Sequence, residues 1–161
     1  MTFAAATSVS VKKSRAEIEA ILRRYGADSF LSGWQDRKAM VQFRANGRYV
    51  RFVMTMPDPN DKRFTKHKKH AWRDRTADEA RRLYEQACRT AWRALALVIK
   101  AKLEAVETGI TTFEHEFLAH VVLPDGQTVG QWMEPQLAEV YASGLMPRTF
   151  PALPASSEED S

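Results

Sequence analysis

Residues 39–54 read AMVQFRANGRYVRFVM, with two alternating runs on either side of the central Asn46-Gly47 pair. Asn-Gly is typical of a type I′ turn, because both residues accept the positive φ angles that this turn needs. The turn sets the register of an antiparallel hairpin, and that register makes one of its faces wholly apolar. The pairs on this face are Phe43 with Val50, Val41 with Phe52, and Ala39 with Met54.

The other face of the hairpin is mixed. Cations and an aromatic side chain lie near the turn, and apolar side chains lie further from it. The facing pairs are Arg44 with Tyr49, Gln42 with Arg51, and Met40 with Val53. We expect this face to be half-exposed to water or occupied by a ligand.

A third strand and a helix precede the hairpin. Phe30 and Trp34 lie in a short apolar stretch that ends at Asp36-Arg37. Further upstream, Ser14-Arg15-Ala16-Glu17 has the form of a capping box, and Gly26 suits a left-handed C-cap. Between these signals, apolar residues with helical spacing form one face: Ile18, Ile21, Leu22 and Tyr25.

A long helix follows the hairpin after a basic excursion. Proline cannot donate to a ladder, so Pro57 ends the strand, and we expect residues 57–75 to form a long exposed loop. Thr76-Ala77-Asp78-Glu79 is a second capping box, and neither proline nor glycine occurs again before Gly109. At 1.5 Å per residue, the helix is about 45 Å long.

This helix has two different sides. The expected core side comprises Leu83, Ala87, Ala91, Ala94, Leu95, Val98 and Ile99. The opposite edge carries Arg82, Arg89, Arg93 and Lys100.

Short elements complete the chain. Thr111-Thr112-Phe113-Glu114 predicts the start of a helix that runs to His120, and Pro124-Asp125-Gly126 predicts a turn. A last helix covers roughly residues 129–142, with Pro135 near its start or at a kink. Its apolar residues predict docking on the long helix: Trp132, Leu137, Val140 and Tyr141.

We therefore predict an α+β fold, in which a three-stranded antiparallel sheet packs on a long helix, with an N-terminal helix and short C-terminal helices. Residues 12–143 form a single domain that includes the basic excursion 57–75. Residues 144–161 form a Pro-rich tail with an acidic tip, which we expect to be mobile or bound to a partner. The length of 161 residues and the 44% of hydrophobic residues suit one globular core.

Composition also narrows the function. The longest strongly apolar run, residues 94–99, is far too short to cross a bilayer, so we expect no membrane association. The single cysteine, Cys88, excludes an internal disulfide and a cysteine-based zinc site, and it suits a reducing cytoplasm. The net charge of +4 is concentrated in residues 58–75, where seven cations outnumber three carboxylates.

The sequence does not favour catalysis. His115 and His120 are five residues apart, whereas the zinc-protease helix needs histidines four apart. Glu116 and His120 are instead spaced for an ordinary pair on the helix surface. The chain has no Gly-rich phosphate loop and no nucleophile elbow. We expect a protein that is not an enzyme and that needs neither metal nor cofactor.

The basic excursion interleaves cations with flat rings, the mixture that binds single-stranded nucleic acid: cations contact phosphates and rings stack on unpaired bases. Capping at Thr76 places this excursion at the start of the cationic helix, so both could form one electropositive track. The candidate nucleic-acid-binding residues are Lys62, Arg63, Phe64, Lys66, Lys68, Lys69, Trp72, Arg82, Arg89 and Arg93.

Two stretches, WRALALVIKAKLEAVE (residues 92–107) and FLAHVVLPDG (residues 117–126), resemble a group of small, uncharacterised proteins encoded by bacteriophages and prophages. This resemblance implies a role in phage replication, recombination or counter-defence. The element order is also similar to that of the single-strand annealing proteins of recombination, which assemble into rings with a basic groove. That similarity implies an oligomer that anneals or coats single strands, and it is an analogy of element order alone.

Other functions stay open. The chain is alternatively a protein-interaction module that binds a host or phage protein through the helix face and the Pro-rich tail. A weaker alternative is a metal-dependent hydrolase or nuclease that uses Glu114, Glu116 and His120. In the last alternative, the basic loop only confers solubility, and Phe64 and Trp72 pack onto the core of the protein. The protein is then a subunit of a larger assembly.

Overall fold

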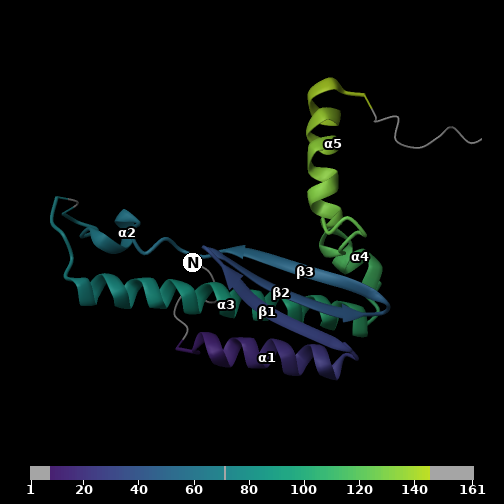
Figure 1. Ribbon diagram of the computed structural model, residues 1–161, viewed down its shortest axis with the longest axis horizontal. Coiled ribbons are helices and arrows are strands. Elements are labelled where there is room, and N and C mark those ends of the chain that lie inside the picture. Colours follow the sequence, from purple (N-terminus) through teal and green to yellow (C-terminus); the bar gives the residue numbers. More distant parts are fainter. Residues whose placement is uncertain (1–7, 71, 146–161) are drawn as a thin grey trace, which may run out of the picture.

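The computed structural model of the chain describes residues 8–70 and 72–145 (Figure 1). In chain order its elements are α1 (Val11–Arg24), β1 (Ser29–Gln35), β2 (Lys38–Ala45), β3 (Arg48–Thr55), α2 (Lys62–Thr65), α3 (Ala77–Glu107), α4 (Phe113–Phe117), the 3₁₀ helix η1 (Leu118–His120) and α5 (Val129–Ser143). The predicted α+β class is confirmed. The Pro-rich part of the predicted tail, residues 146–161, lies outside the described residues.

The sheet has the order β1-β2-β3, and all neighbours are antiparallel. Asn46 and Gly47 have φ angles of 49° and 69°, as the type I′ turn requires. The register of the hairpin is the predicted one, with Phe43 opposite Val50 and Val41 opposite Phe52. The short turn at Asp36-Arg37 then joins β1 to β2.

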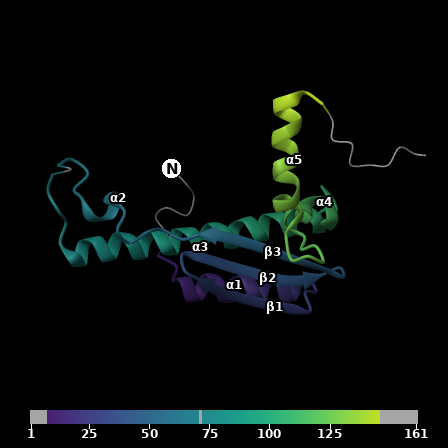
Figure 2. The same ribbon diagram turned by 45° about the horizontal axis from the view of Figure 1, so that its top comes forward.

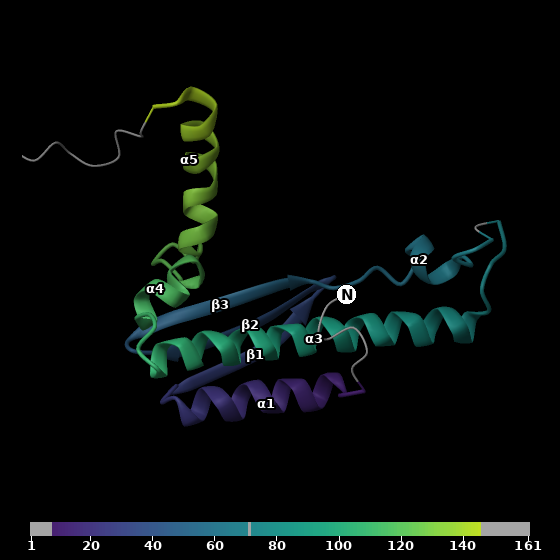
Figure 3. The same ribbon diagram turned by 180° about the vertical axis from the view of Figure 1, so that it is seen from behind.

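Helices α1 and α3 lie side by side on one face of the sheet, and no helix of the described residues covers the other face (Figures 1 and 3). The core lies between these layers. Its largest buried side chains are Ile18, Leu22, Val41, Phe43, Val50, Phe52, Trp92, Leu95, Ile99, Leu103, Phe113 and Phe117. Phe117 meets Phe43 edge to face, with ring centroids 5.8 Å apart. Full burial of each such side chain stabilises the fold by about 1.5–3 kcal/mol.

Helix α1 begins one turn earlier than predicted. Ser10 is the N-cap, and its hydroxyl accepts a hydrogen bond from the Lys13 amide at 3.2 Å. Ser14, the predicted cap, is buried inside the helix, because it lies four residues before Ile18 on the face toward the sheet. The predicted end is confirmed: Gly26 has a φ of 85°, and the Ala27 amide donates to the Leu22 carbonyl.

Helix α3 starts at the predicted capping box. The Glu79 amide donates to the Thr76 hydroxyl, and the Thr76 amide donates to the Glu79 carboxylate at 3.0 Å. The Thr76 hydroxyl also donates to the Glu79 carboxylate, and the two bonds from Thr76 to this carboxylate lower the pKa of Glu79. The helix ends at Glu107, and Gly109 follows with a φ of 77°.

The core face of α3 differs from the prediction. It comprises Trp92, Leu95, Ala96, Ile99 and Leu103, whereas Leu83 and Val98 are exposed. The face is rotated because Trp92 points into the core. Leu83 has no sheet opposite it, since the N-terminal half of α3 extends beyond the strands (Figure 1).

The predicted helix start at Thr111-Thr112-Phe113-Glu114 is confirmed, with Thr112 as the N-cap, although α4 ends at Phe117 and the 3₁₀ helix η1 continues to His120. The predicted turn is confirmed at Gly126, whose φ is 88°. The predicted docking of α5 on α3 is wrong. Helix α5 starts on η1 and then rises away from the sheet and α3, as Figure 2 also shows. It has no buried residue, and Trp132, Leu137 and Tyr141 are exposed. Among the described residues, no helix has the length and apolar character needed to cross a bilayer.

Candidate nucleic-acid interface

The described part of the basic excursion, residues 57–70 and 72–75, is largely exposed, as predicted, but it folds into a lobe around the short helix α2 and is not a simple loop. Its helix α2 places Phe64 against Tyr84 of α3, with ring centroids 6.0 Å apart and the rings nearly perpendicular. Phe64 is only 5% exposed. It therefore anchors the lobe on α3 and is not available to stack on a base, which corrects the prediction for this residue.

Two residues close the lobe at its C-terminal end. Lys66 pairs with Asp74 through a backbone bridge and an ion pair of 2.5 Å. The Arg75 guanidinium donates to the carbonyl oxygens of Arg63 and Phe64, at 2.7 and 3.1 Å. Lys66 and Arg75 thus help to hold the lobe's shape as well as contributing charge.

The lobe surrounds a cationic hollow of about 620 Å³, which we call the lobe hollow. The residues that line it are Lys62, Arg63, Lys66, His67, Lys68 and Arg75. Asp61 pairs with Arg63 at 3.4 Å. Asp58 pairs with Arg37, which lies outside the lobe, at 2.5 Å. In the described part of the chain, Lys62 and Lys68 form no ion pair, so the hollow keeps a surplus of positive charge.

Trp72 lies on the same lobe and is 81% exposed. Its ring centroid is 6.0 Å from that of His70, which is also exposed. The alternative prediction that Trp72 is tucked onto the core is wrong. An exposed indole beside a second flat ring is available for stacking.

The predicted cationic stripe on α3 is divided among three environments. Arg82 is exposed and lines a smaller hollow with Arg75, so it continues the basic surface of the lobe. Arg89 is half-buried and donates to the Gln86 side chain at 2.6 Å. Arg93 faces α1 and pairs with Glu17. Lys100 of α3 is exposed, as is Lys69 of the lobe. The predicted continuous track therefore includes Arg82 but not Arg93, because α1 covers that flank of α3.

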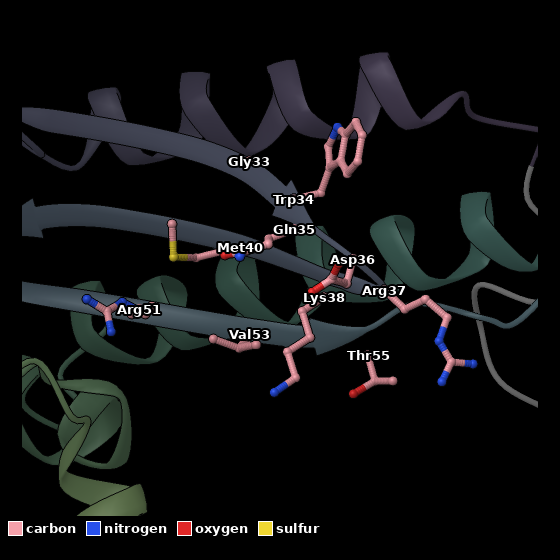
Figure 4. A pocket seen from close by; sticks show the side chains of 10 residues that line it. All are labelled: Gly33, Trp34, Gln35, Asp36, Arg37, Lys38, Met40, Arg51, Val53 and Thr55. Atoms are coloured by element: carbon pink, nitrogen blue, oxygen red, sulfur yellow. The ribbon is translucent and has the colours of Figure 1, made fainter.

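The uncovered face of the sheet, the open sheet face, holds a second hollow of about 720 Å³ (Figure 4). Gly33 of β1 faces Met40 across the strands and adds no side chain to this hollow, whereas Trp34 and Gln35 of the same strand line it. Lys38, Arg51 and Val53 line it as well. Sequence reasoning predicted the mixed character of this face from the hairpin register, but assigned no residue of it to the binding site.

The groups considered for catalysis form structural contacts. Glu116 pairs with Lys102 of α3 at 2.9 Å and not with His120 as predicted. His120 stacks on Phe52, with centroids 4.0 Å apart, and burial lowers its pKa. The pKa of Tyr84 is raised mainly by a hydrogen bond with Cys88, and burial of the phenol raises it further. Within residues 8–70 and 72–145, no group of His, Cys, Asp and Glu side chains is arranged to hold a metal ion.

A comparison of the chain with protein-family models, curated proteins and solved structures finds no match. The functional argument therefore rests on the residues and their geometry.

Proposed function

We propose that this protein binds single-stranded nucleic acid through the lobe hollow, with Arg82 extending the surface along α3. The observation that carries the proposal is the lining of the hollow, five cations and a histidine around one concavity. Phosphate groups are the ligands that such a surface attracts most strongly. No catalytic step is part of the proposal.

The exposed ring of Trp72 favours a single strand over a duplex. Bases of a single strand are free to stack on an aromatic side chain, whereas those of a duplex are already stacked on each other. Trp72 lies on the lobe that carries the cations, so one strand could contact both. Strand coating or annealing, the role that the resemblance to annealing proteins implies, needs this combination of phosphate and base contacts.

The lysines of the lobe differ in whether they also support its structure. Lys66 is paired with Asp74 and supports the lobe, so its substitution would combine loss of charge with loss of structure. Lys62 and Lys68 are exposed, line the hollow and have no ion pair within the described chain. A Lys62→Glu, Lys68→Glu double variant therefore changes charge with little effect on the fold.

The test is fluorescence anisotropy with labelled single-stranded DNA, single-stranded RNA and duplex DNA over a series of salt concentrations. We expect tighter binding to a single strand, with log K falling linearly as log salt rises. Each phosphate of a single strand that the protein neutralises adds about 0.7 to the steepness of this line. The double variant neutralises two phosphates fewer, so its slope should be shallower by about 1.4.

The matched control is Lys12→Glu with Lys13→Glu, which makes the same change in net charge at exposed positions of α1. This control should retain the wild-type slope. An equal decrease in slope in both double variants would show that only the net charge matters and that the lobe hollow is not the binding site. Absence of binding by the wild-type protein at low salt would overturn the proposal and favour the protein-interaction alternative.

A further inference from the structure

Helix α5 presents an apolar stripe that nothing in the described chain covers. Met133, Leu137 and Tyr141 are spaced four residues apart and lie on one side of the helix, and Val140 lies beside them. Leu137 is 48% exposed and Tyr141 88% exposed. Side chains of this size are normally buried when they share one helix face.

The helix also has little to stabilise it as it stands. Its length of 15 residues is near the limit at which an isolated helix is stable in water. Pro135 lies inside it and removes one backbone hydrogen bond. Because no residue of α5 is buried, packing against the body contributes little. A surface that covers the stripe would therefore stabilise the helix itself.

The open sheet face has the complementary composition. Its side chains include the cations Lys38, Arg44 and Arg51. Arg44 pairs with Asp28 at 3.4 Å, Arg51 donates to the Gly126 carbonyl oxygen, and Asp36 lines the hollow, whereas Lys38 forms no ion pair within the described chain. Leu31 and Val53 add exposed apolar surface on either side of the 720 Å³ hollow. Helix α5 carries two carboxylates, Glu134 and Glu139, and no cation.

The dimensions of the two surfaces agree as well. A helix of 15 residues is about 22 Å long, and a strand of eight residues extends over about 27 Å. We propose that α5 of one copy of this chain docks on the open sheet face of a second copy. Its apolar stripe covers Leu31, Met40 and Val53. Glu134 flanks the stripe and faces Lys38 of the sheet, whereas Glu139 lies on the opposite side of α5.

The direction of α5 favours a second copy over its own sheet. Gly130 lies so close to η1 that a Cβ there would be 2.9 Å from the Ala119 carbonyl oxygen. This close approach fixes the first turn of α5 on η1, and the rest of the helix points away from the body (Figure 1). The inference does not depend on nucleic acid, so it stands or falls separately from the proposed function.

The test is the mass in solution by light scattering after nuclease treatment, over a range of protein concentrations. We expect the wild-type mass to reach at least twice 18.3 kDa. Two charge-reversed variants should each return to 18.3 kDa: Glu134→Lys on α5, and Lys38→Glu on the sheet. The Lys12→Glu, Lys13→Glu variant is the control and should retain the wild-type mass.

An equimolar mixture of the two charge-reversed variants decides the matter. The mixture contains one wild-type pair of surfaces and one pair with both charges reversed, so it should recover the higher mass. A wild-type protein of 18.3 kDa at every concentration would overturn the inference. So would a higher mass that both variants retain, or a decrease in mass in both variants that the mixture does not repair.

Discussion

Arg93 of α3 forms an ion pair with Glu17 of α1, and only 24% and 32% of the two side chains are exposed. The pair joins the two helices that cover the sheet. Arg15 of α1 adds to the same seam, because its guanidinium lies 5.5 Å from the ring centroid of Trp92. A cation that the sequence assigned to a ligand thus belongs to the helix interface.

Replacing Arg93 by alanine should therefore lower the free energy of unfolding by about 1–3 kcal/mol, between the values for exposed and buried pairs. Urea denaturation measures this change. Arg82→Ala is the matched control, because Arg82 is exposed on the same helix and should leave the unfolding midpoint unchanged. Equal stability of the two variants would show that the pair with Glu17 does not hold α1 on α3.

Ser14→Ala should stabilise the protein. The Ser14 hydroxyl is buried and has no hydrogen-bond partner within the described chain, so its removal relieves an unpaired polar group. Alanine is also the better helix former. We expect a gain of about 1 kcal/mol in the free energy of unfolding, measured in urea.

Ser10→Ala serves as the comparison, because it should lower the free energy of unfolding instead of raising it. The Ser10 hydroxyl caps α1, and loss of such a cap lowers stability by about 1 kcal/mol. If Ser14 were the cap, as its sequence context suggests, Ser14→Ala would lower stability and Ser10→Ala would leave it nearly unchanged. The pair of measurements thus separates the two helix starts.

The elements that the sequence predicted well are those set by local interactions. The Asn46-Gly47 turn fixes its own φ angles and, through them, the whole register of the hairpin. The capping box at Thr76 similarly fixes the start of α3. Each signal involves residues within a few positions of one another, so no knowledge of the rest of the fold is needed.

The prediction failed where the environment of a residue depends on a segment that is distant in the sequence. Which residues of α3 face the core depends on where the sheet ends. Whether Arg93 is free to bind a ligand depends on the position of α1. Phe64 was assigned to ligand binding because nothing in the excursion shows that Tyr84 lies beside it. The mixed face of the hairpin was recognised from its alternation, but only the structure shows that it stays uncovered.

Phe64→Ala should loosen the lobe without unfolding the domain. The ring is buried against Tyr84, outside the main core, so its loss removes the anchor of α2. Hydrogen exchange should then accelerate in residues 62–75, while amides of β2 and β3 keep their protection. Trp72→Ala, at an exposed ring of the same lobe, should leave both regions unchanged. Uniform acceleration in the sheet would instead make the lobe part of one cooperative unit with the core.

His120 should make the protein less stable in mild acid. Burial lowers its pKa from the usual 6.5, the Lys102 ammonium adds to this effect, and a hydrogen bond with the Arg51 backbone opposes it. The unfolded chain therefore binds the proton more readily than the folded one, and stability is lost as the pH falls below 6.5. We expect the urea midpoint of the wild type to decrease between about pH 7.5 and 5.5, a window in which most carboxylates stay ionised.

A His120→Phe variant preserves an aromatic ring against Phe52 and cannot titrate, so its midpoint should decrease less over the same window. His115 is exposed on the neighbouring helix, and His115→Phe serves as the control that retains the wild-type slope. Because His67, His70 and His115 are present in both the wild type and the His120→Phe variant, the difference between the slopes of these two proteins isolates His120. Identical slopes would mean that the stacked imidazole is equally easy to protonate in the folded and unfolded states, and the acid sensitivity would then belong to other groups.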